Sequence, residues 1–131
     1  MGHATFKIGE LEAVIGDNAT HDGHRAGYNG IWSLRHKRSK RNLFVPAYAG
    51  FNLEHYFNGE TEFLNNEVLF QPRKFPMTFS KKSDRQAELK QNPIPHFFVE
   101  SVTTFTLREP HYLDIEFKCT PVQHVHPSGW F

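Results

Sequence analysis

The stretch FFVESVTTFTLREPHYLDIEFKCTPV, residues 97–122, decides the fold because it contains two consecutive runs of alternating side chains. In the first run, small and apolar residues share one parity: Val99, Ser101, Thr103, Phe105 and Leu107. In the second run, the matching positions are Leu113, Ile115, Phe117 and Cys119. Polar or hydroxyl side chains fill most intervening positions, and a period of two residues is typical of a half-buried strand. The two runs, separated by residues 108–111, therefore predict a β-hairpin.

Shorter strand-like segments precede this hairpin at residues 4–8, 11–16, 30–36, 67–72 and 75–82, with Gly, Pro or Asn between several of them. Residues 84–92 form the one segment compatible with a helical turn, and they fit an edge strand equally well. Many short strands with regular breaks are typical of a sandwich or barrel. The sequence therefore predicts an all-β, antiparallel β-sandwich over residues 1–131, as a single domain.

Composition supports the all-β class and bears on disulfides, membrane segments and location. The 131 residues include 13 Phe, 4 Tyr and 2 Trp, and aromatic residues favour strands. The single Cys119 excludes an internal disulfide framework. No apolar run approaches the ~20 residues that a membrane-spanning helix needs, so no membrane segment is predicted. The start, MGHATFKIGE, lacks a signal-peptide core, and a cytoplasmic location is the default expectation.

The most basic segment is RHKRSKR, residues 35–41, with five Arg or Lys side chains. Such a run can bind phosphates. It also lies between two strand-like segments, where an exposed loop would leave these side chains solvated. Because the net charge of the whole chain is only +1 with His neutral, no nucleic-acid partner is predicted.

The segment HDGHRAGYNGIW, residues 21–32, gathers polar and aromatic side chains around three glycines. His24, Arg25 and Asn29 could hydrogen-bond the hydroxyls of a sugar, and Tyr28 and Trp32 could stack on its ring. This combination predicts a carbohydrate site. The alternative is a polar loop that Tyr28 and Trp32 anchor to the core.

The segment FNLEHYFNG, residues 51–59, places Asn52, Glu54 and Tyr56 on one face if it is a strand. Asn52 and Glu54 would then bind sugar hydroxyls, and Tyr56 would stack on a pyranose. A glutamate beside a histidine could also act in acid–base chemistry, but Glu54 and His55 would point to opposite faces. The alternative is an amphipathic strand with a solvated Glu54.

Two histidines near the end of the sequence, His124 and His126, would share a face of a strand and could bind one Zn or Fe ion. A competent site needs a third ligand, for which Glu54, His111 and Asp114 are candidates. This pattern supports an alternative function as a metal-dependent enzyme of cupin-like build. Because Pro127 favours a break, the main interpretation is a His-rich strand end, with no cofactor expected.

Three segments, residues 24–36, 42–59 and 102–121, resemble the N-terminal region of bacterial proteins with the galactose-mutarotase-like supersandwich. The resemblance implies a sandwich whose concave face binds carbohydrate, as in sugar epimerases and polysaccharide-processing enzymes. It also implies a His acid and a Glu base at the anomeric centre. Because a complete supersandwich needs well over 131 residues and the sequence ends in SGWF, we expect the N-terminal part of a larger domain.

Carbohydrate binding, alone or as part of a sugar-active enzyme, is therefore the leading functional prediction. The metal-dependent enzyme with His124 and His126 is one alternative. A structural or interaction sandwich without a small-molecule site is the other. The sequence leaves open whether the protein is an enzyme.

Overall fold

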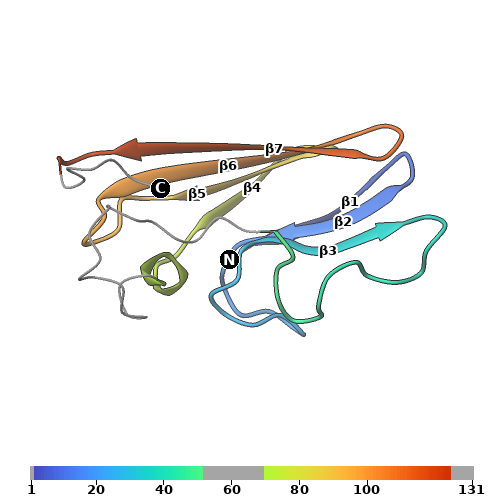
Figure 1. Cartoon of the computed structure of the whole chain (residues 1–131), viewed down its shortest axis with the longest axis horizontal. Coiled ribbons are helices and arrows are strands. Elements are labelled where there is room, and N and C mark those ends of the chain that lie inside the picture. The colour runs from blue at the N-terminus through green and yellow to red at the C-terminus, as the bar shows by residue number, and fades with distance from the viewer. Residues whose placement is uncertain (1, 52–69, 125–131) are drawn as a thin grey trace.

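The computed structural model describes residues 2–51 and 70–124, which form two antiparallel sheets. The first sheet contains β1 (His3–Ile8), β2 (Leu11–Gly16) and β3 (Gly30–His36), in that order. The second contains β4 (Thr78–Ser83), β5 (Gln86–Gln91), β6 (Val99–Arg108) and β7 (Tyr112–Pro121), also in chain order. Figure 1 shows the two sheets as separate layers. The predicted all-β, antiparallel sandwich is confirmed.

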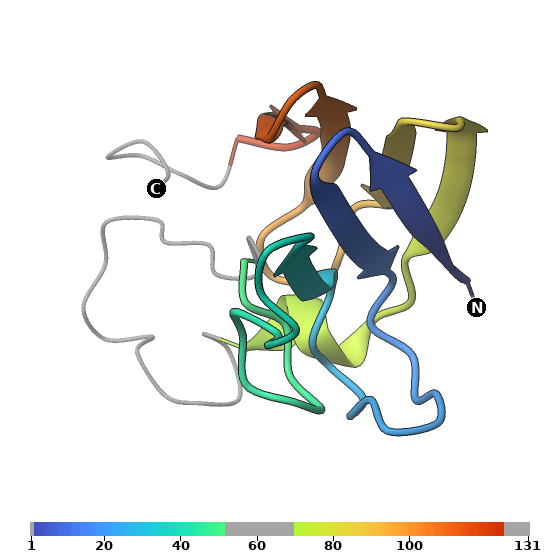
Figure 2. The same cartoon turned by 90° about the vertical axis from the view of Figure 1, so that its right-hand side faces the viewer.

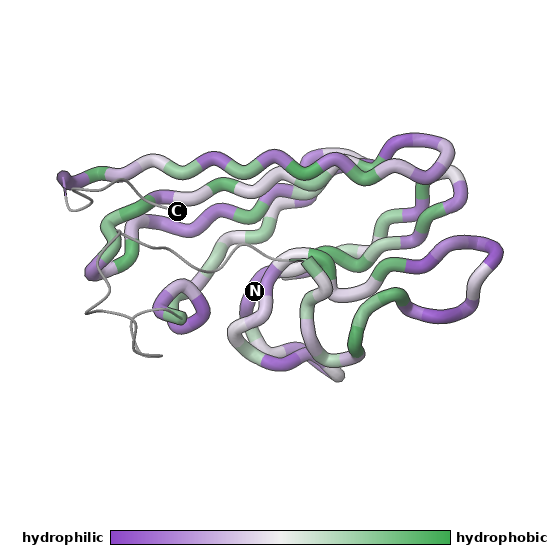
Figure 3. The backbone as a smooth tube through the Cα atoms, viewed as in Figure 1, coloured by the Kyte–Doolittle hydropathy of each residue, from purple (hydrophilic) through white to green (hydrophobic). Residues whose placement is uncertain are grey.

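The hairpin of β6 and β7 is the longest pair in the described residues, and it runs in register from Val99 opposite Pro121 to Arg108 opposite Tyr112. The inward parity of β6 is buried throughout, as the alternating pattern predicts. On β7 the matching apolar positions are half-buried while their neighbours are exposed. Figure 3 shows the alternation of hydropathy along this hairpin. The strands between residues 4 and 36 are confirmed as well.

The core lies between the two sheets, which Figure 2 shows from the end that carries the hairpin turns. The first sheet contributes Phe6, Leu11, Ala13, Ile15 and Ile31. The second contributes Ala87, Leu89, Phe105 and Leu107. Each of these side chains is less than 9% exposed. Burial of apolar area stabilises a fold by about 25 cal/mol per Å², so this shared cluster holds the two sheets together.

Both predictions for residues 84–92, a helical turn and an edge strand, are wrong. These residues form neither, because β5 lies between β4 and β6. Ala87, Leu89 and Gln91 are all buried, so the alternation reflects one face of an interior strand packed on the core. A period of two identifies a strand but not its neighbours.

The strand predicted at residues 67–72 is wrong for its described part. Residues Gln71–Lys74 form the 3₁₀ helix η2, and residues 67–69 lie outside the described residues. Pro72 lies in the first turn of this helix, where its fixed φ and missing amide hydrogen are tolerated. The strand predicted at 75–82 begins later, at Thr78.

Two buried amides bind η2 to both sheets. The Nδ2 group of Asn18 donates to the carbonyl oxygens of Pro72 and Phe75, at 3.2 and 2.7 Å. The Nε2 group of Gln91 donates to the same two oxygens, at 2.8 and 2.9 Å. Because Asn18 follows β2 and Gln91 ends β5, these four bonds connect the two layers through one short helix.

Candidate functional site

One end of the sandwich brings together three segments that are distant in sequence: the β1–β2 turn, the end of β3 and the β6–β7 turn. The backbone amide of Glu10 donates to the carbonyl oxygen of Pro110, at 2.7 Å. The backbone amide of Lys37 donates to the carbonyl oxygen of Glu10, at 2.8 Å. The turn residue between β1 and β2 therefore joins one sheet to the other and also holds the loop after β3.

Gly9 allows this approach. Its φ is +56°, in the left-handed region that side chains with a Cβ disfavour. A Cβ on Gly9 would also lie 2.5 Å from the carbonyl oxygen of Pro110, which is closer than real Cβ contacts occur. The β1–β2 turn can therefore dock against the β6–β7 turn only with glycine at this position.

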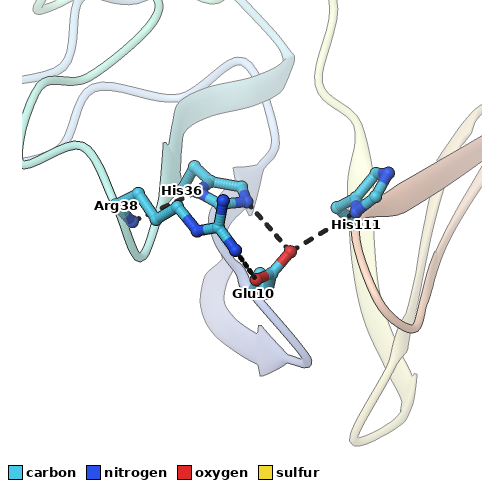
Figure 4. Close-up of polar contacts among 4 residues, drawn as sticks. All are labelled: Glu10, His36, Arg38 and His111. Carbon is cyan, nitrogen blue, oxygen red and sulfur yellow. Dashed lines mark hydrogen bonds and ion pairs between the residues drawn. The ribbon is translucent and has the colours of Figure 1, made fainter.

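The carboxylate of Glu10 lies at the centre of a polar cluster, shown in Figure 4. Its Oε2 accepts a hydrogen bond from Nε2 of His36 at 3.2 Å and lies 3.4 Å from Nδ1 of His111. Its Oε1 lies 3.8 Å from the guanidinium of Arg38. The hydrogen bond from His36 is the main cause that lowers the pKa of Glu10, and His111 and Arg38 act in the same direction. Glu10 is therefore an ionised acceptor held by the two histidines and by the charge of Arg38.

A cavity of about 800 Å³ opens beside this cluster. Its charged lining includes the basic residues Lys7, Arg35, Lys37 and Lys40 and the acidic residues Glu10, Glu12 and Glu109. Lys7 pairs with Glu12 at 2.9 Å. Within residues 2–51 and 70–124, no carboxylate lies in ion-pair range of the side chains of Arg35, Lys37 and Lys40. The cavity thus presents hydrogen-bond acceptors together with unneutralised positive charge.

The predicted binding residues of the 21–32 segment divide into buried and surface groups. Trp32 is 8% exposed, and the ring of His24 stacks on it with 3.7 Å between the centroids. His3 stacks on the same indole at 5.0 Å. Asn29 is 2% exposed. Trp32 therefore offers no free ring face to a sugar, and this part of the segment fits the alternative interpretation of a loop anchored to the core.

His24 is fixed inside this loop rather than exposed to a ligand. Its Nε2 lies 2.6 Å from the backbone carbonyl oxygen of Tyr28, so the imidazole donates to it. Desolvation by burial is the main cause that lowers the pKa of His24, and the hydrogen bond to Tyr28 opposes it. Neutral His24 thus closes the loop and covers the indole of Trp32.

Arg25 and Tyr28 remain at the surface, where they meet Tyr48. Tyr28 packs edge to face on Tyr48, with 4.8 Å between the ring centroids. The guanidinium of Arg25 lies 5.1 Å from the Tyr48 ring centroid and donates to the Tyr48 hydroxyl. The guanidinium of Arg73 lies 4.5 Å from the centroid of Tyr28. This second surface combines aromatic rings with hydrogen-bond donors.

Asn52, Glu54 and Tyr56 lie outside the described residues, and so does His126. β7 ends at Pro121, and His124 lies in a bend after it. The predicted metal pair would have required the strand to continue through His124. Among the residues that the structure describes, no group of three potential metal ligands is close enough to hold an ion.

The proposed third ligands in that metal hypothesis have other partners. His111 contacts Glu10, and Asp114 forms an ion pair with Arg108. Glu54 lies outside the described residues.

The cluster around Glu10 was not predicted as a site. His36 lies 26 positions from Glu10, and His111 lies in the β6–β7 turn of the other sheet. The signals in the sequence were the basic segment at residues 35–41 and the count of nine histidines, and neither indicates which side chains meet. Docking of the two turns is what brings these side chains together.

Comparisons with protein-family models, with curated protein sequences and with solved structures found no match for this chain. No helix within the described residues has the length and apolar character that crossing a bilayer requires.

Proposed function

We propose that this protein is a carbohydrate-binding β-sandwich and that the saccharide occupies the cavity beside Glu10. The observation that carries the proposal is the combination of a cavity of about 800 Å³ with oriented, charged hydrogen-bonding groups in its lining. Ligand sites are concave and use a few precisely placed polar groups. A carboxylate such as Glu10, already held by His36 and Arg38, can accept from sugar hydroxyls with little loss of side-chain entropy.

An aromatic side chain beside the cluster supports the same function. Tyr112 is 53% exposed, and its ring lies 4.9 Å from that of His111. An exposed ring of this kind can pack against the apolar face of a pyranose. The half-buried pair of Tyr28 and Tyr48 is a second aromatic group, and with Arg25 beside it this group retains two residues of the predicted site, Arg25 and Tyr28.

The state of Glu10 favours binding over catalysis. A general base works best when its pKa is near the operating pH. The hydrogen bond from His36 and the contacts with His111 and Arg38 lower the pKa of Glu10, which weakens it as a base. We therefore propose recognition, rather than proton transfer at the anomeric centre, as the role of this cluster.

Titration of the folded protein with a panel of neutral and acidic oligosaccharides, followed by NMR chemical shifts, tests the proposal. We expect at least one saccharide to shift the resonances of Glu10, His36 and Glu12, and Glu12→Gln to weaken that binding. Glu116→Gln, on the exposed face of β7, is the matched control and should bind normally. If no saccharide shifts any resonance while the chain is folded, carbohydrate binding is excluded.

A further inference from the structure

We infer that the saccharide bound beside Glu10 carries an anionic oxygen substituent, a carboxylate, sulfate or phosphate, which Arg35, Lys37 and Lys40 recognise. The inference rests on the proposed carbohydrate function and specifies the class of ligand. All three side chains line the cavity and are exposed. Within the described part of the chain, none of them has a carboxylate partner.

Arg35, near the end of β3, and Lys37 and Lys40, in the loop that follows, lie around one opening. The amide of Lys37 donates to the carbonyl of Glu10 at 2.8 Å, and the amide of Ser39 donates to the carbonyl of His36 at 2.8 Å. These bonds fix the backbone on both sides of Arg38, whose guanidinium faces Glu10. The backbone from which Lys37 and Lys40 extend is therefore fixed at the cavity before a ligand arrives, which reduces the entropy cost of binding.

The balance of charges in the cavity lining favours an anionic ligand. Glu12 forms an ion pair with Lys7, and Glu10 forms one with Arg38. Glu109 is the one further carboxylate in the lining, so Arg35, Lys37 and Lys40 still leave an excess of positive charge. Guanidinium groups match the geometry of carboxylates, sulfates and phosphates with two parallel hydrogen bonds, and Lys adds point charges.

The same lining favours a sugar over a nucleic acid. Nucleic-acid binding draws its affinity from contacts with many phosphates along a basic stripe. Here Glu10, Glu12 and Glu109 are interspersed with the basic residues and would repel a continuous phosphodiester backbone. They would instead accept hydrogen bonds from hydroxyls, which a sugar ring with a single anionic group offers in number.

Matched pairs of probes test the inference by calorimetric titration: an oligogalacturonide and its methyl ester, a sulfated oligosaccharide and its desulfated form, and glucose 6-phosphate and glucose. We expect the anionic member of at least one pair to bind more tightly by about tenfold or more. The pair that responds identifies the substituent. The preference should weaken as salt increases, because exposed charges are screened.

The triple variant Arg35→Gln, Lys37→Gln, Lys40→Gln should bring the affinity ratio close to one, while Lys118→Gln on β7 should leave it unchanged; circular dichroism checks that both are folded. Equal binding of neutral and anionic members by the wild-type protein would refute the inference and leave carbohydrate binding intact. If no saccharide binds, both the proposed carbohydrate function and the preference for an anionic saccharide are refuted. Tighter binding of a single-stranded DNA oligonucleotide than of any anionic saccharide would overturn the inference in favour of a nucleic-acid site.

Discussion

The backbone amide of Glu10 donates a hydrogen bond to the carbonyl oxygen of Pro110, 2.7 Å away, and thereby joins the β1–β2 turn of one sheet to the β6–β7 turn of the other. The side chain of the same residue contacts His111 from the second turn. One residue thus connects the layers of the sandwich and forms the centre of the candidate site. Changes in this contact should alter stability and binding together.

Gly9→Ala should destabilise the fold by more than about 2 kcal/mol, because the left-handed conformation alone costs a residue with a Cβ about 1–2 kcal/mol. The added Cβ would also meet the carbonyl of Pro110 at 2.5 Å. Urea denaturation measures the change. Gly23→Ala is the matched control, since Gly23 has a φ of +73° and a Cβ added there would have no neighbour within 4 Å. Equal losses of stability in the two variants would show that the close contact with Pro110 does not destabilise Gly9→Ala.

Glu10→Gln should reduce the loss of stability in acid. The pKa of Glu10 is lowered in the folded state, chiefly by the hydrogen bond from His36, relative to an ordinary value of 4.5. The carboxylate therefore stabilises the fold above pH 4.5, and this stability is lost as the pH falls through the lowered pKa. Free energies of unfolding measured from about pH 3 to 7 should fall less steeply below pH 4.5 in the variant.

A companion variant, His36→Gln, should raise the pKa of Glu10, read from the carboxyl carbon shift in NMR. Arg38→Gln should raise it less, because Arg38 acts only through charge at 3.8 Å. An unchanged pKa in His36→Gln would contradict the geometry of this cluster.

Asn18→Ala and Gln91→Ala should be strongly coupled. Each amide donates to the carbonyls of both Pro72 and Phe75, so either one alone still satisfies these acceptors. The double variant leaves both carbonyls without their amide donors, and an unsatisfied buried acceptor costs about 1–3 kcal/mol. A double-mutant cycle by urea denaturation should therefore show a loss larger than the sum of the single losses, by about 1 kcal/mol or more. Additive losses would indicate that the shared carbonyls do not matter.

Stability should also decrease below pH 6.5 because of His24. Burial lowers the pKa of His24 from its ordinary value of 6.5, so the unfolded chain binds its proton first as the pH falls. The loss begins near pH 6.5 and is complete below the folded pKa. His24→Gln should reduce this slope in denaturation curves, and His3→Gln should do the same, because burial also lowers the pKa of His3.

Fluorescence gives an independent readout of the same titration. In a Trp130→Phe background, Trp32 is the only tryptophan, and protonation of the stacked His24 should alter its emission across that pH range. If His24→Gln retains both the full slope and the full change in emission, another group is responsible.

The strands of the hairpin between Val99 and Pro121 were predictable because strand formation depends on a local pattern. Every second residue of β6 is buried, and that alternation is readable without knowledge of any partner. The interior position of β5 was not predictable, because Ala87 and Leu89 alternate in the same way in an edge strand with one buried face. The 3₁₀ helix at Gln71–Lys74 depends on the distant amides of Asn18 and Gln91.

The predicted carbohydrate residues illustrate the same difference. The types of side chain in residues 21–32 indicated hydrogen bonding and stacking, and both occur, but within the protein: His24 bonds the carbonyl of Tyr28 and stacks on Trp32. The type of a residue determines which contacts its side chain can make. Whether a ligand or the chain itself makes them depends on burial, which the segment alone does not determine.

The sequence by itself determined an all-β chain, because the two-residue period and the breaks at Gly, Pro and Asn act over a few neighbouring positions. Only the tertiary structure decided that Glu10, His36 and His111 meet, because two sheets must pack face to face before their turns touch. Packing also left Arg35, Lys37 and Lys40 around a cavity without carboxylate partners in the described residues. The physical reason is that strand formation is local, whereas a site built from turns requires closure of long loops and burial of a shared core.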